Sequence, residues 1–247
     1  MRRRAVLTAA LAAPALLRTG HARSNEPVDV ELVLAVDVSR SVDAQEQELQ
    51  FRGYEAAFRD PRLVEGIAGG PVGAIACTLF AWSDWHIQRV LVPWARLDGP
   101  RACDRFADAL AAAPRETFLY TSISGAMDFA ARQFGQGFEG TRRVVDISGD
   151  GVNNSGRPVA EARAEALARG IVLNGLAVLD RSPTPAVLAG TVPPLDAYYL
   201  ESVIGGPGSF LVVAEGFATF EAAVRRKIIR EIALAPPPAP RVDRVFA

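Results

Sequence analysis

The sequence predicts an α/β protein in which one mostly parallel sheet carries helices on both of its faces. Short, nearly uninterrupted apolar runs, as expected for strands buried on both faces, alternate with longer segments whose apolar residues recur at helical spacing. Such alternation is typical of parallel strands joined by helical crossovers. With 247 residues, the chain is long enough for one large domain of this kind. We therefore expect a doubly wound sheet, with one antiparallel edge strand, in a single domain over residues 23–234.

The first predicted unit is a strand followed by a helix. The apolar run over residues 30–37 indicates a buried strand. A helix over residues 43–59 follows it, and Asp43 and Glu46 at its start have the spacing of a capping box. Pro61 ends this helix, because the residue before a proline is pushed out of helical geometry.

The next predicted unit is a β-hairpin. After a glycine-rich connection, residues 72–82 form a strongly apolar strand, and Ser83-Asp84 turns the chain into a second arm over residues 87–92. Pro93 and the polar residues of this arm place it at an edge of the sheet, where a missing backbone donor is tolerated.

The second half of the chain continues the alternation. Its predicted helices span residues 101–113, 121–134, 158–169, 195–203 and 217–234, and its predicted strands span residues 143–148, 171–178 and 209–213. A loop over residues 184–194 separates the last two units. Four prolines within residues 235–240 cannot continue a helix. Residues 235–247 are therefore expected to be a Pro-rich disordered tail.

The first residues have the form of a secretory signal. Three consecutive arginines precede an apolar run over residues 5–17, and Gly20-His21-Ala22 offers a small-x-small cleavage site. The run is shorter than the roughly 20 residues that a membrane span needs. We expect residues 1–22 to be a signal peptide of the Sec or the twin-arginine type. The mature chain would then be exported, periplasmic or secreted, without a membrane span.

Charge and residue usage exclude several classes of function. Removing residues 1–22 takes away four arginines and no acid, which leaves 23 basic against 28 acidic residues and a net charge of −5. A nucleic-acid partner is not expected, because binding to nucleic acid needs a basic surface. Cys77 and Cys103 are the only cysteines and His86 is the one mature histidine, too few for a Cys/His zinc site. The two cysteines could form a disulfide after export or remain buried free thiols.

An oxygen-rich motif follows the first predicted strand. Asp37, Ser39 and Ser41 alternate along the turn between this strand and the next helix. In open α/β sheets, ligands bind at this carboxyl end of the strands. Two further residues fall at the same edge: Thr121 opens a predicted helix, and Asp150 follows the strand over residues 143–148. Carboxylates and hydroxyls of this kind suit a hard cation such as Mg2+.

The order DxSxS, then a threonine that opens a helix, then Asp-Gly after a strand resembles the von Willebrand factor A-type (vWA) domain over roughly residues 28–234. The resemblance implies a Rossmann-like fold and a metal-ion-dependent adhesion site (MIDAS). Ser39, Ser41 and Thr121 would be hydroxyl ligands of Mg2+, or of Mn2+ or Ca2+. Asp37 and Asp150 would hold the ion largely through water, and a partner's carboxylate would complete the shell.

Other features bear on how closely the family pattern applies. The family usually has a glycine before the threonine, where this chain has Tyr120. The exported chain, the run from Asp146 to Asn154 and the tryptophan-rich hairpin are similar to a group of bacterial exported vWA proteins of unknown function. The glycine-rich segment at residues 205–208 has neither the GxGxxG nor the GxxxxGK[ST] order of a phosphate-binding loop, and no dinucleotide fingerprint is expected.

These observations favour an exported, non-enzymatic, metal-binding module that mediates protein–protein interaction or adhesion through an acidic residue of its partner. Two alternatives remain open: a metal-dependent hydrolase, with Asp146 or Asp84 as its base, and a metal-free structural vWA domain. A haloacid-dehalogenase-like phosphatase is excluded, because that family needs a second aspartate where this chain has Ser39.

A few polar and aromatic residues have less certain roles. Asn153, Asn154 and Trp85 are candidates for partner binding, although the asparagines could simply shape a turn and the tryptophan could pack between its hairpin and the neighbouring helix. Asp146 lies inside an apolar strand and needs a partner, for which an arginine is expected. The basic run over residues 225–227 is expected to form a solvated helix face.

Overall fold

The computed structural model describes residues 25–179, 193–232 and 241–246. These residues form a seven-stranded sheet in the order β3-β2-β1-β4-β5-β6-β7, in which β3 is antiparallel to β2 and all other neighbours are parallel. The predicted fold class is therefore confirmed. The strands are β1 (Glu26–Asp37), β2 (Ile75–Trp82), β3 (Gln88–Leu97), β4 (Phe138–Gly149), β5 (Ile171–Val178), β6 (Phe210–Ala214) and β7 (Arg241–Val245).

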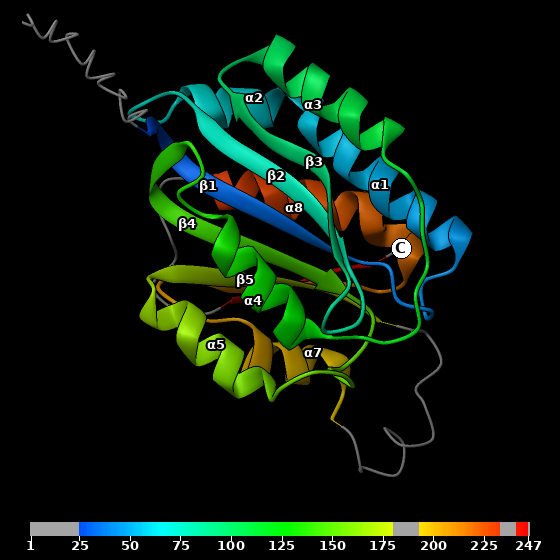
Figure 1. The fold of residues 1–247 in the computed structure, drawn as a ribbon. Coiled ribbons are helices and arrows are strands. Elements are labelled where there is room, and N and C mark those ends of the chain that lie inside the picture. Colours follow the sequence, from blue (N-terminus) through cyan, green and yellow to red (C-terminus); the bar gives the residue numbers. More distant parts are fainter. Residues whose placement is uncertain (1–24, 180–192, 233–240, 247) are drawn as a thin grey trace, which may run out of the picture.

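Helices cover both faces of the sheet (Figure 1). They are α1 (Ala44–Phe58), α2 (Pro61–Ala68), α3 (Pro100–Ala112), α4 (Ile123–Gln133), α5 (Val159–Ala168), α7 (Leu195–Tyr198) and α8 (Phe220–Ile232), with a π-helical turn (Tyr199–Val203) after α7 and a 3-10 turn (Phe217–Thr219) before α8. The helices α1, α2, α3 and α8 cover one face, and α4, α5 and the π-helical turn cover the other. No helix of the described segments is long and apolar enough to cross a membrane.

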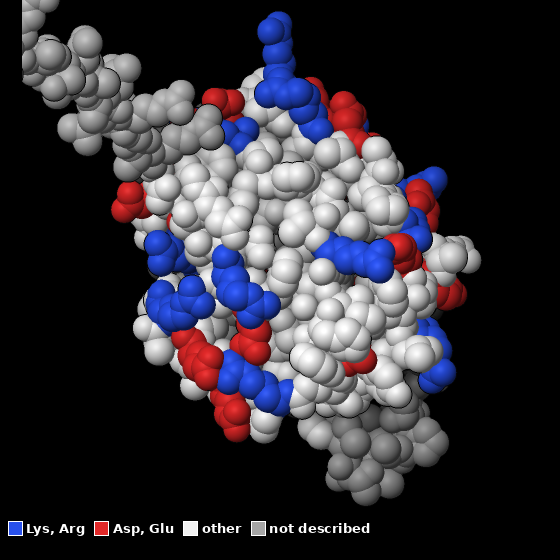
Figure 2. Space-filling view, in the orientation of Figure 1, with Lys and Arg blue, Asp and Glu red and all other residues white. Residues whose placement is uncertain are grey.

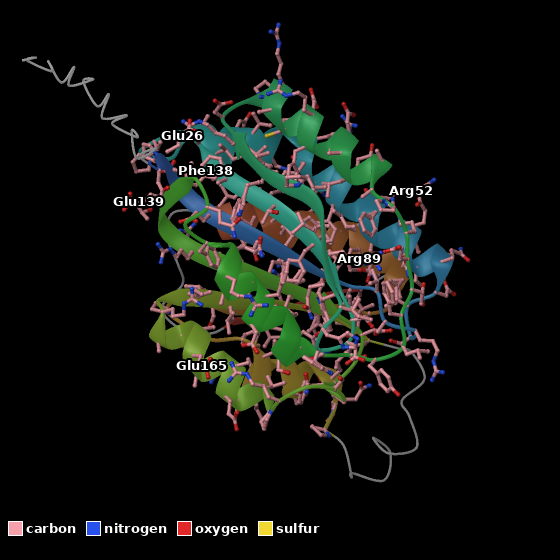
Figure 3. The ribbon with its side chains drawn as sticks, in the orientation of Figure 1. Glu26, Arg52, Arg89, Phe138, Glu139 and Glu165 are labelled. Atoms are coloured by element: carbon pink, nitrogen blue, oxygen red, sulfur yellow. The ribbon has the colours of Figure 1, made fainter. Side chains whose placement is uncertain are left out.

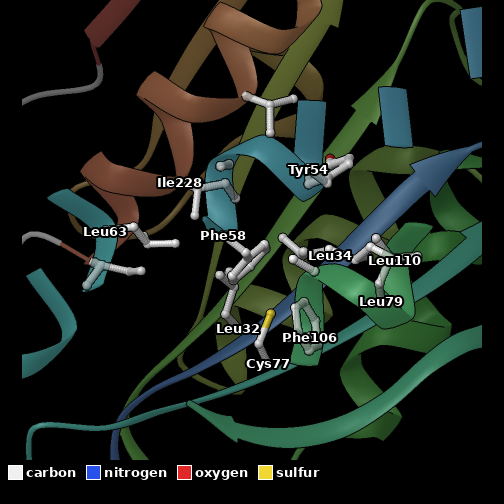
Figure 4. Close-up of a cluster of buried hydrophobic side chains, with 14 of the residues drawn as sticks. Leu32, Leu34, Tyr54, Phe58, Leu63, Cys77, Leu79, Phe106, Leu110 and Ile228 are labelled. Carbon is white, nitrogen blue, oxygen red and sulfur yellow. The ribbon is translucent and has the colours of Figure 1, made fainter. Parts of the chain in front are cut away.

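The core lies in two layers that share β1. Leu32 and Leu34 face the layer under α1, α3 and α8, where the rings of Phe58 and Phe106 lie 4.7 Å apart (Figure 4). Val33, which lies between them, and Ala35 face the opposite layer. Because both faces of β1 are buried, residues 32–36 of this strand are all apolar, which is why this part of its sequence shows no alternation.

Several predicted elements differ in extent from those observed, and one helix was not predicted. Asp60 and Pro61 do end α1, but Asp60 also caps a second helix, since its side chain accepts a hydrogen bond from Arg62 N at 2.9 Å. The edge strand β3 continues through Pro93, whose missing donor costs nothing at an edge. Strand β4 begins at Phe138, five residues before the predicted start at residue 143.

The expected disordered tail is wrong for residues 241–245, which form β7. This strand pairs in parallel with β6. Ion pairs anchor it, among them Arg230 Nη1–Asp243 Oδ2 at 2.7 Å and Arg244 Nη1–Glu215 Oε1 at 3.0 Å. Because backbone pairing and charge hold β7 rather than an apolar face, its sequence carries no strand pattern. The expected signal peptide at residues 1–22, most of the loop at 184–194 and the prolines at 235–240 lie outside the described residues.

A buried ionic cluster attaches α8 to the sheet. Lys227 is 0% exposed and contacts Asp146 of β4, while its Nζ lies 2.5 Å from Glu231 Oε1. The partner of Asp146 is therefore a lysine and not the expected arginine, and the run over residues 225–227 is not a uniformly solvated face. At helical spacing, Lys227 lies on the same side of α8 as the buried residues Ala223 and Val224.

The two carboxyl groups of this cluster compete for one ammonium group. Burial, and secondarily the charge of Asp146, raise the pKa of Glu231 to about 7. Burial also raises the pKa of Asp146, although Lys227 opposes that change. Tyr54 and Cys77 face the cluster from α1 and β2, and Arg142 Nη2 donates to the backbone oxygen of Glu231 at 2.6 Å. Neighbouring cysteines Cys77 and Cys103 are free, buried thiols.

Replacing Lys227 by methionine is expected to lower the free energy of unfolding by about 3–5 kcal/mol, because it leaves two buried carboxyl groups without their cation. Arg226→Met is the matched control: Arg226 lies on the same helix but its side chain is 56% exposed. It should change the unfolding free energy by less than about 1 kcal/mol. Denaturant unfolding at neutral pH measures both, and equal effects of the two changes would contradict the structural role of Lys227.

The stability of the metal-free protein should fall as the pH rises from 4.5 toward about 7. A Glu231 pKa raised above its ordinary 4.5 means that the folded state binds this proton more tightly, so the stabilisation is full at low pH and is lost as pH passes the folded pKa. The change is on the order of 3 kcal/mol. Unfolding in EDTA across this range should show a shallower pH dependence for Glu231→Gln than for wild type. The exposed Glu221→Gln on the same helix should leave it unchanged; a Glu231→Gln curve parallel to wild type would refute the assignment.

Candidate metal centre

The predicted motif lies where β1 and β4 end side by side. These strands are parallel neighbours with Val36 opposite Ser148, so their carboxyl-terminal loops leave the sheet together. Figure 3 shows Glu26, Phe138 and Glu139 grouped at the opposite end of the sheet, where the two strands begin. The loops that follow β1 and β4 therefore carry Asp37 and Asp150 to the same edge.

Hydrogen bonds connect four of the predicted residues in a chain. Ser39 N donates to Asp37 Oδ1 at 2.7 Å, and the hydroxyl oxygens of Ser39 and Ser41 lie 3.1 Å apart. Ser41 Oγ then donates to Asp150 Oδ1 at 2.7 Å. Asp37 and Ser39 are buried, whereas Ser41 is exposed. The chain of oxygens thus runs from the interior to the surface.

Thr121 lies just before α4 and approaches the same edge of the sheet from that helix. Its backbone N–H donates to Asn154 Oδ1 at 2.8 Å, and Asn154 N donates back to the Thr121 carbonyl at 2.8 Å. A Cβ placed on Gly151 would lie 3.5 Å from Thr121 Oγ1, so this hydroxyl lies beside the Asp150–Gly151 turn. Thr121 is therefore placed beside the turn that carries Asp150. Tyr120, which stands where the family usually has glycine, is 51% exposed.

The side chains of the two asparagines form hydrogen bonds that shape the loop after β4. Asn153 Oδ1 accepts a hydrogen bond from Ser124 N at 3.0 Å, and Asn153 Nδ2 donates to the Ser155 carbonyl at 3.0 Å. Together with the Asn154–Thr121 pair, these bonds fix the loop after β4 against the beginning of α4. Their partner-binding role stays a prediction; the contacts themselves position Thr121.

The tryptophans of the hairpin have different environments. Trp82 is fully buried, and Trp94 Nε1 donates to the Gln133 carbonyl at 3.0 Å. Trp85 is 61% exposed at the turn between β2 and β3, with its ring centroid 5.0 Å from that of His86. Packing between the hairpin and α4 therefore accounts for Trp82 and Trp94 but leaves the indole of Trp85 at the surface.

Asp37 carries a buried carboxylate that its surroundings satisfy incompletely. Its Oδ2 has no well-formed hydrogen bond to any described residue. Burial, and next the charge of Asp150, raise the pKa of Asp37 to about 8, while hydrogen bonds from Ser39 lower it by less. Tyr199, which no sequence motif marks, lies close by, and its hydroxyl also lacks a partner among the described residues. A tyrosine in a short helix is indistinguishable from a core residue by sequence alone.

These donors fit a divalent cation that prefers oxygen. Hydroxyl and carboxylate oxygens from separate loops converge, and Asp37 Oδ2 is a buried acceptor without a donor. The described residues contain no cluster of three or more His, Cys, Asp or Glu side chains able to hold a metal, so the centre is not a carboxylate cage. An ion held here would keep positions free for water or an external ligand.

Neither residue considered as a hydrolytic base points its carboxylate at this centre. Asp146 is in contact with Lys227 on the α8 side of the sheet. Asp84 accepts from Trp85 N at 2.7 Å and contacts the Ser155 hydroxyl, and its Oδ2 lies 3.8 Å from His86 Nδ1. Both carboxylates are occupied by structural contacts.

Comparison with known families and structures identifies what this chain is similar to. A family model described as "Protein of unknown function (DUF1194)" matches residues 27–236. No curated protein sequence matches the chain. A structure of proximal thread matrix protein 1 from the mussel byssus, with a zinc-occupied MIDAS motif, is 12% identical with a TM-score of 0.58, and the match covers 85% of this chain and 49% of the mussel chain.

Two bacterial structures are similar as well. A von Willebrand factor type A structure from Catenulispora acidiphila is 14% identical with a TM-score of 0.55, over 83% of this chain and 43% of that one. The conserved hypothetical protein BatB from Bacteroides thetaiotaomicron is 19% identical with a TM-score of 0.53, over 83% of this chain and 100% of that one. At these identities the likeness is one of fold. The chain spans about half the length of the mussel chain.

Two glycines of the β4 loop provide a matched test of the packing around Asp37. A Cβ on Gly149 would lie 2.8 Å from Asp37 Oδ2 and 2.8 Å from the Tyr199 hydroxyl oxygen, whereas a Cβ on Gly151 meets nothing closer than 3.5 Å. Gly149→Ala should therefore lower the free energy of unfolding by about 1–3 kcal/mol. Gly151→Ala should change it by about 0.5 kcal/mol or less. Denaturant unfolding in EDTA compares the two, and a tolerated Gly149→Ala would show that Asp37 is not tightly packed.

Proposed function

Since the chain belongs to the family described as "Protein of unknown function (DUF1194)" and has the fold of a vWA domain, we propose that it is an exported module that recognises a protein partner through a bound divalent metal. The metal would be held by Asp37, Ser39, Ser41, Thr121 and Asp150. The observation that carries this proposal is the convergence of these oxygen donors around a buried carboxylate oxygen that lacks a hydrogen bond.

The donor set favours a hard cation, with Mg2+ first and Mn2+ or Ca2+ as alternatives. Mg2+ keeps several of its waters and needs few direct protein ligands, which suits a site built mainly from hydroxyls. The zinc-occupied MIDAS motif of the mussel byssus protein supports a divalent ion on this fold. When bound, the ion would supply a position for an anionic oxygen, because neutral hydroxyl ligands leave it with residual positive charge.

An external carboxylate is the ligand that best completes such a centre. The hydroxyl of Ser41 is exposed, so the outer side of the oxygen chain is open to a partner. A partner's aspartate or glutamate would bind the ion there by charge and by oxygen chemistry. Since Asp84 and Asp146 are engaged elsewhere, binding is favoured over hydrolysis.

A location outside the cytoplasm fits this role. Its support is the signal-like segment at residues 1–22. One similar fold belongs to a matrix protein of the mussel byssus. An interaction module outside the cytoplasm would meet Mg2+ and Ca2+ from its surroundings, and its partner would be another exported or surface protein.

Calorimetric titration of the protein with Mg2+ and Mn2+, together with thermal melts, tests the metal site. We expect binding with stabilisation of about 2.7 kcal/mol at a hundredfold excess over Kd. Asp37→Ala and Ser39→Ala should weaken binding at least tenfold, because each removes a donor of the centre. Asp43→Ala is the matched control on the same loop: its side chain caps α1 through Glu46 N at 2.8 Å and does not reach the centre.

That control should lose about 1 kcal/mol of stability while keeping its metal affinity. Wild-type protein that shows neither heat nor stabilisation at millimolar ion would favour the metal-free structural alternative. Turnover of phosphoesters or peptides that Asp37→Ala abolishes would favour the hydrolase instead.

A further inference from the structure

Large apolar side chains are exposed beside the candidate metal centre. Among the described residues, four such side chains are more than half exposed: Trp85 at 61%, Leu119 at 64%, Tyr120 at 51% and Phe246 at 69%. Three of them, Trp85, Leu119 and Tyr120, belong to the two segments that lie against Thr121; they are called the apolar collar below. Grouped exposure of this kind is unusual on a soluble protein and marks interaction surfaces.

The collar is attached to the centre through its backbone. Phe118, next to Leu119, forms a β-bridge with Ser39, and its N–H donates to the Val38 carbonyl at 3.0 Å. The Ser83 hydroxyl contacts the carbonyl of Tyr120, and Ser122 N donates to the Ser83 carbonyl at 2.6 Å. The collar side chains are thus exposed while the chain that carries them is fixed.

Trp85 is fixed in the same way by the first turn of α4. A Cβ on Gly125 would lie 2.9 Å from Trp85 Cα, and a Cβ on Gly156 would lie 3.0 Å from Trp85 Cβ. The hairpin turn therefore packs directly on the helix that Thr121 precedes, with glycines where the backbones approach. In Figure 2 the surface over this turn and the beginning of α4 is largely uncharged, in contrast to the paired arginines and acids over α5.

One cation accompanies the collar. Arg40 lies between Ser39 and Ser41, is exposed, and forms no ion pair within the described part of the chain. Arg89, by contrast, pairs with Glu116 at 2.7 Å and lies over the ring of Phe118. Arg40 is therefore available to an anionic ligand at the centre. Tryptophan, tyrosine and arginine are also the residues that dominate binding energy at protein interfaces.

We propose that the apolar collar and Arg40 bind an extended polypeptide segment in which an aspartate or glutamate is flanked by large apolar side chains. The proposal rests on the proposed function, since the carboxylate would reach the metal while its neighbours cover the collar. An acidic sugar would satisfy the cation and Arg40 but would leave the collar exposed to water. A nucleic acid conflicts with the net charge of −5 after residue 22.

Peptide-binding measurements test the apolar collar separately from the metal centre. The probes are fluorescent decapeptides with one central aspartate, flanked either by Phe and Leu or by Ser and Gly, titrated with the purified protein in Mg2+ and in EDTA. We expect the apolar-flanked peptide to bind at least tenfold more tightly than the polar-flanked one in Mg2+, and neither to bind in EDTA. This tenfold preference should fall to about twofold or less in Leu119→Ser/Tyr120→Ser and, independently, in Trp85→Ser.

Phe246→Ser is the matched control, because Phe246 is as exposed but follows β7 at the far edge of the sheet. It should keep the full preference, and Mn2+ titration checks that each variant retains its metal centre. Equal Mg2+-dependent binding of both peptides would contradict the binding role of the apolar collar and leave the proposed function standing. Failure of both peptides in Mg2+, or binding that persists in EDTA, would overturn both. Self-association that Tyr120→Ser removes and Phe246→Ser does not would mean that a second copy covers the collar, which overturns the partner proposed here.

Discussion

The parallel pairing of β1 with β4 is the constraint on which the rest of the structure depends. Its register, with Leu34 opposite Asp146 and Val36 opposite Ser148, decides that Asp37 and Asp150 leave the sheet beside each other. The register is fixed from both sides, because alternate residues of β1 enter two separate cores. A slip by one residue would turn every side chain of a strand to the opposite face. It would remove Asp146 from Lys227 and leave that buried carboxyl group without its cation, which is strongly destabilising.

Polar contacts in the interior reinforce that register next to the candidate centre. Tyr54 of α1 donates its hydroxyl to Ser148 Oγ at 3.2 Å, and Ser148 Oγ lies 3.3 Å from the carbonyl of Ala35. These contacts join a helix to both central strands, one residue before Gly149. Because buried polar groups need partners with defined geometry, they tolerate less displacement than aliphatic packing does. The loop after β4 therefore starts from a fixed position, and Asn153 and Asn154 extend that order to the beginning of α4.

The sequence predicts those features whose cause is local. The capping box of Asp43 and Glu46 is present as expected, and the buried strand before Asp37 is recognisable because residues 32–36 of β1 are all apolar. The oxygen donors were predictable because carboxyl ends of parallel strands meet at one edge. The burial of Lys227 was not predictable, because it depends on Asp146, a residue distant in sequence. A lysine in a basic run normally lies in solvent. Strand β7 was missed for the same reason, since its ion pairs to Arg230 and Glu215 come from elsewhere in the fold.

The division between buried and exposed residues separates the interior of the candidate centre from its surroundings. Asp37 and Ser39 are almost completely buried, and their positions are determined by the sheet and its loops. Tyr120 contributes its backbone carbonyl to the contact with Ser83, while its side chain points away from that contact into solvent. The fold therefore constrains the main chain at this position but not the side chain, which is why a tyrosine can stand where related domains usually have glycine. Residues that hold the centre and residues that surround it are thus under separate physical constraints, so the surface can change while the geometry of the oxygen donors stays the same.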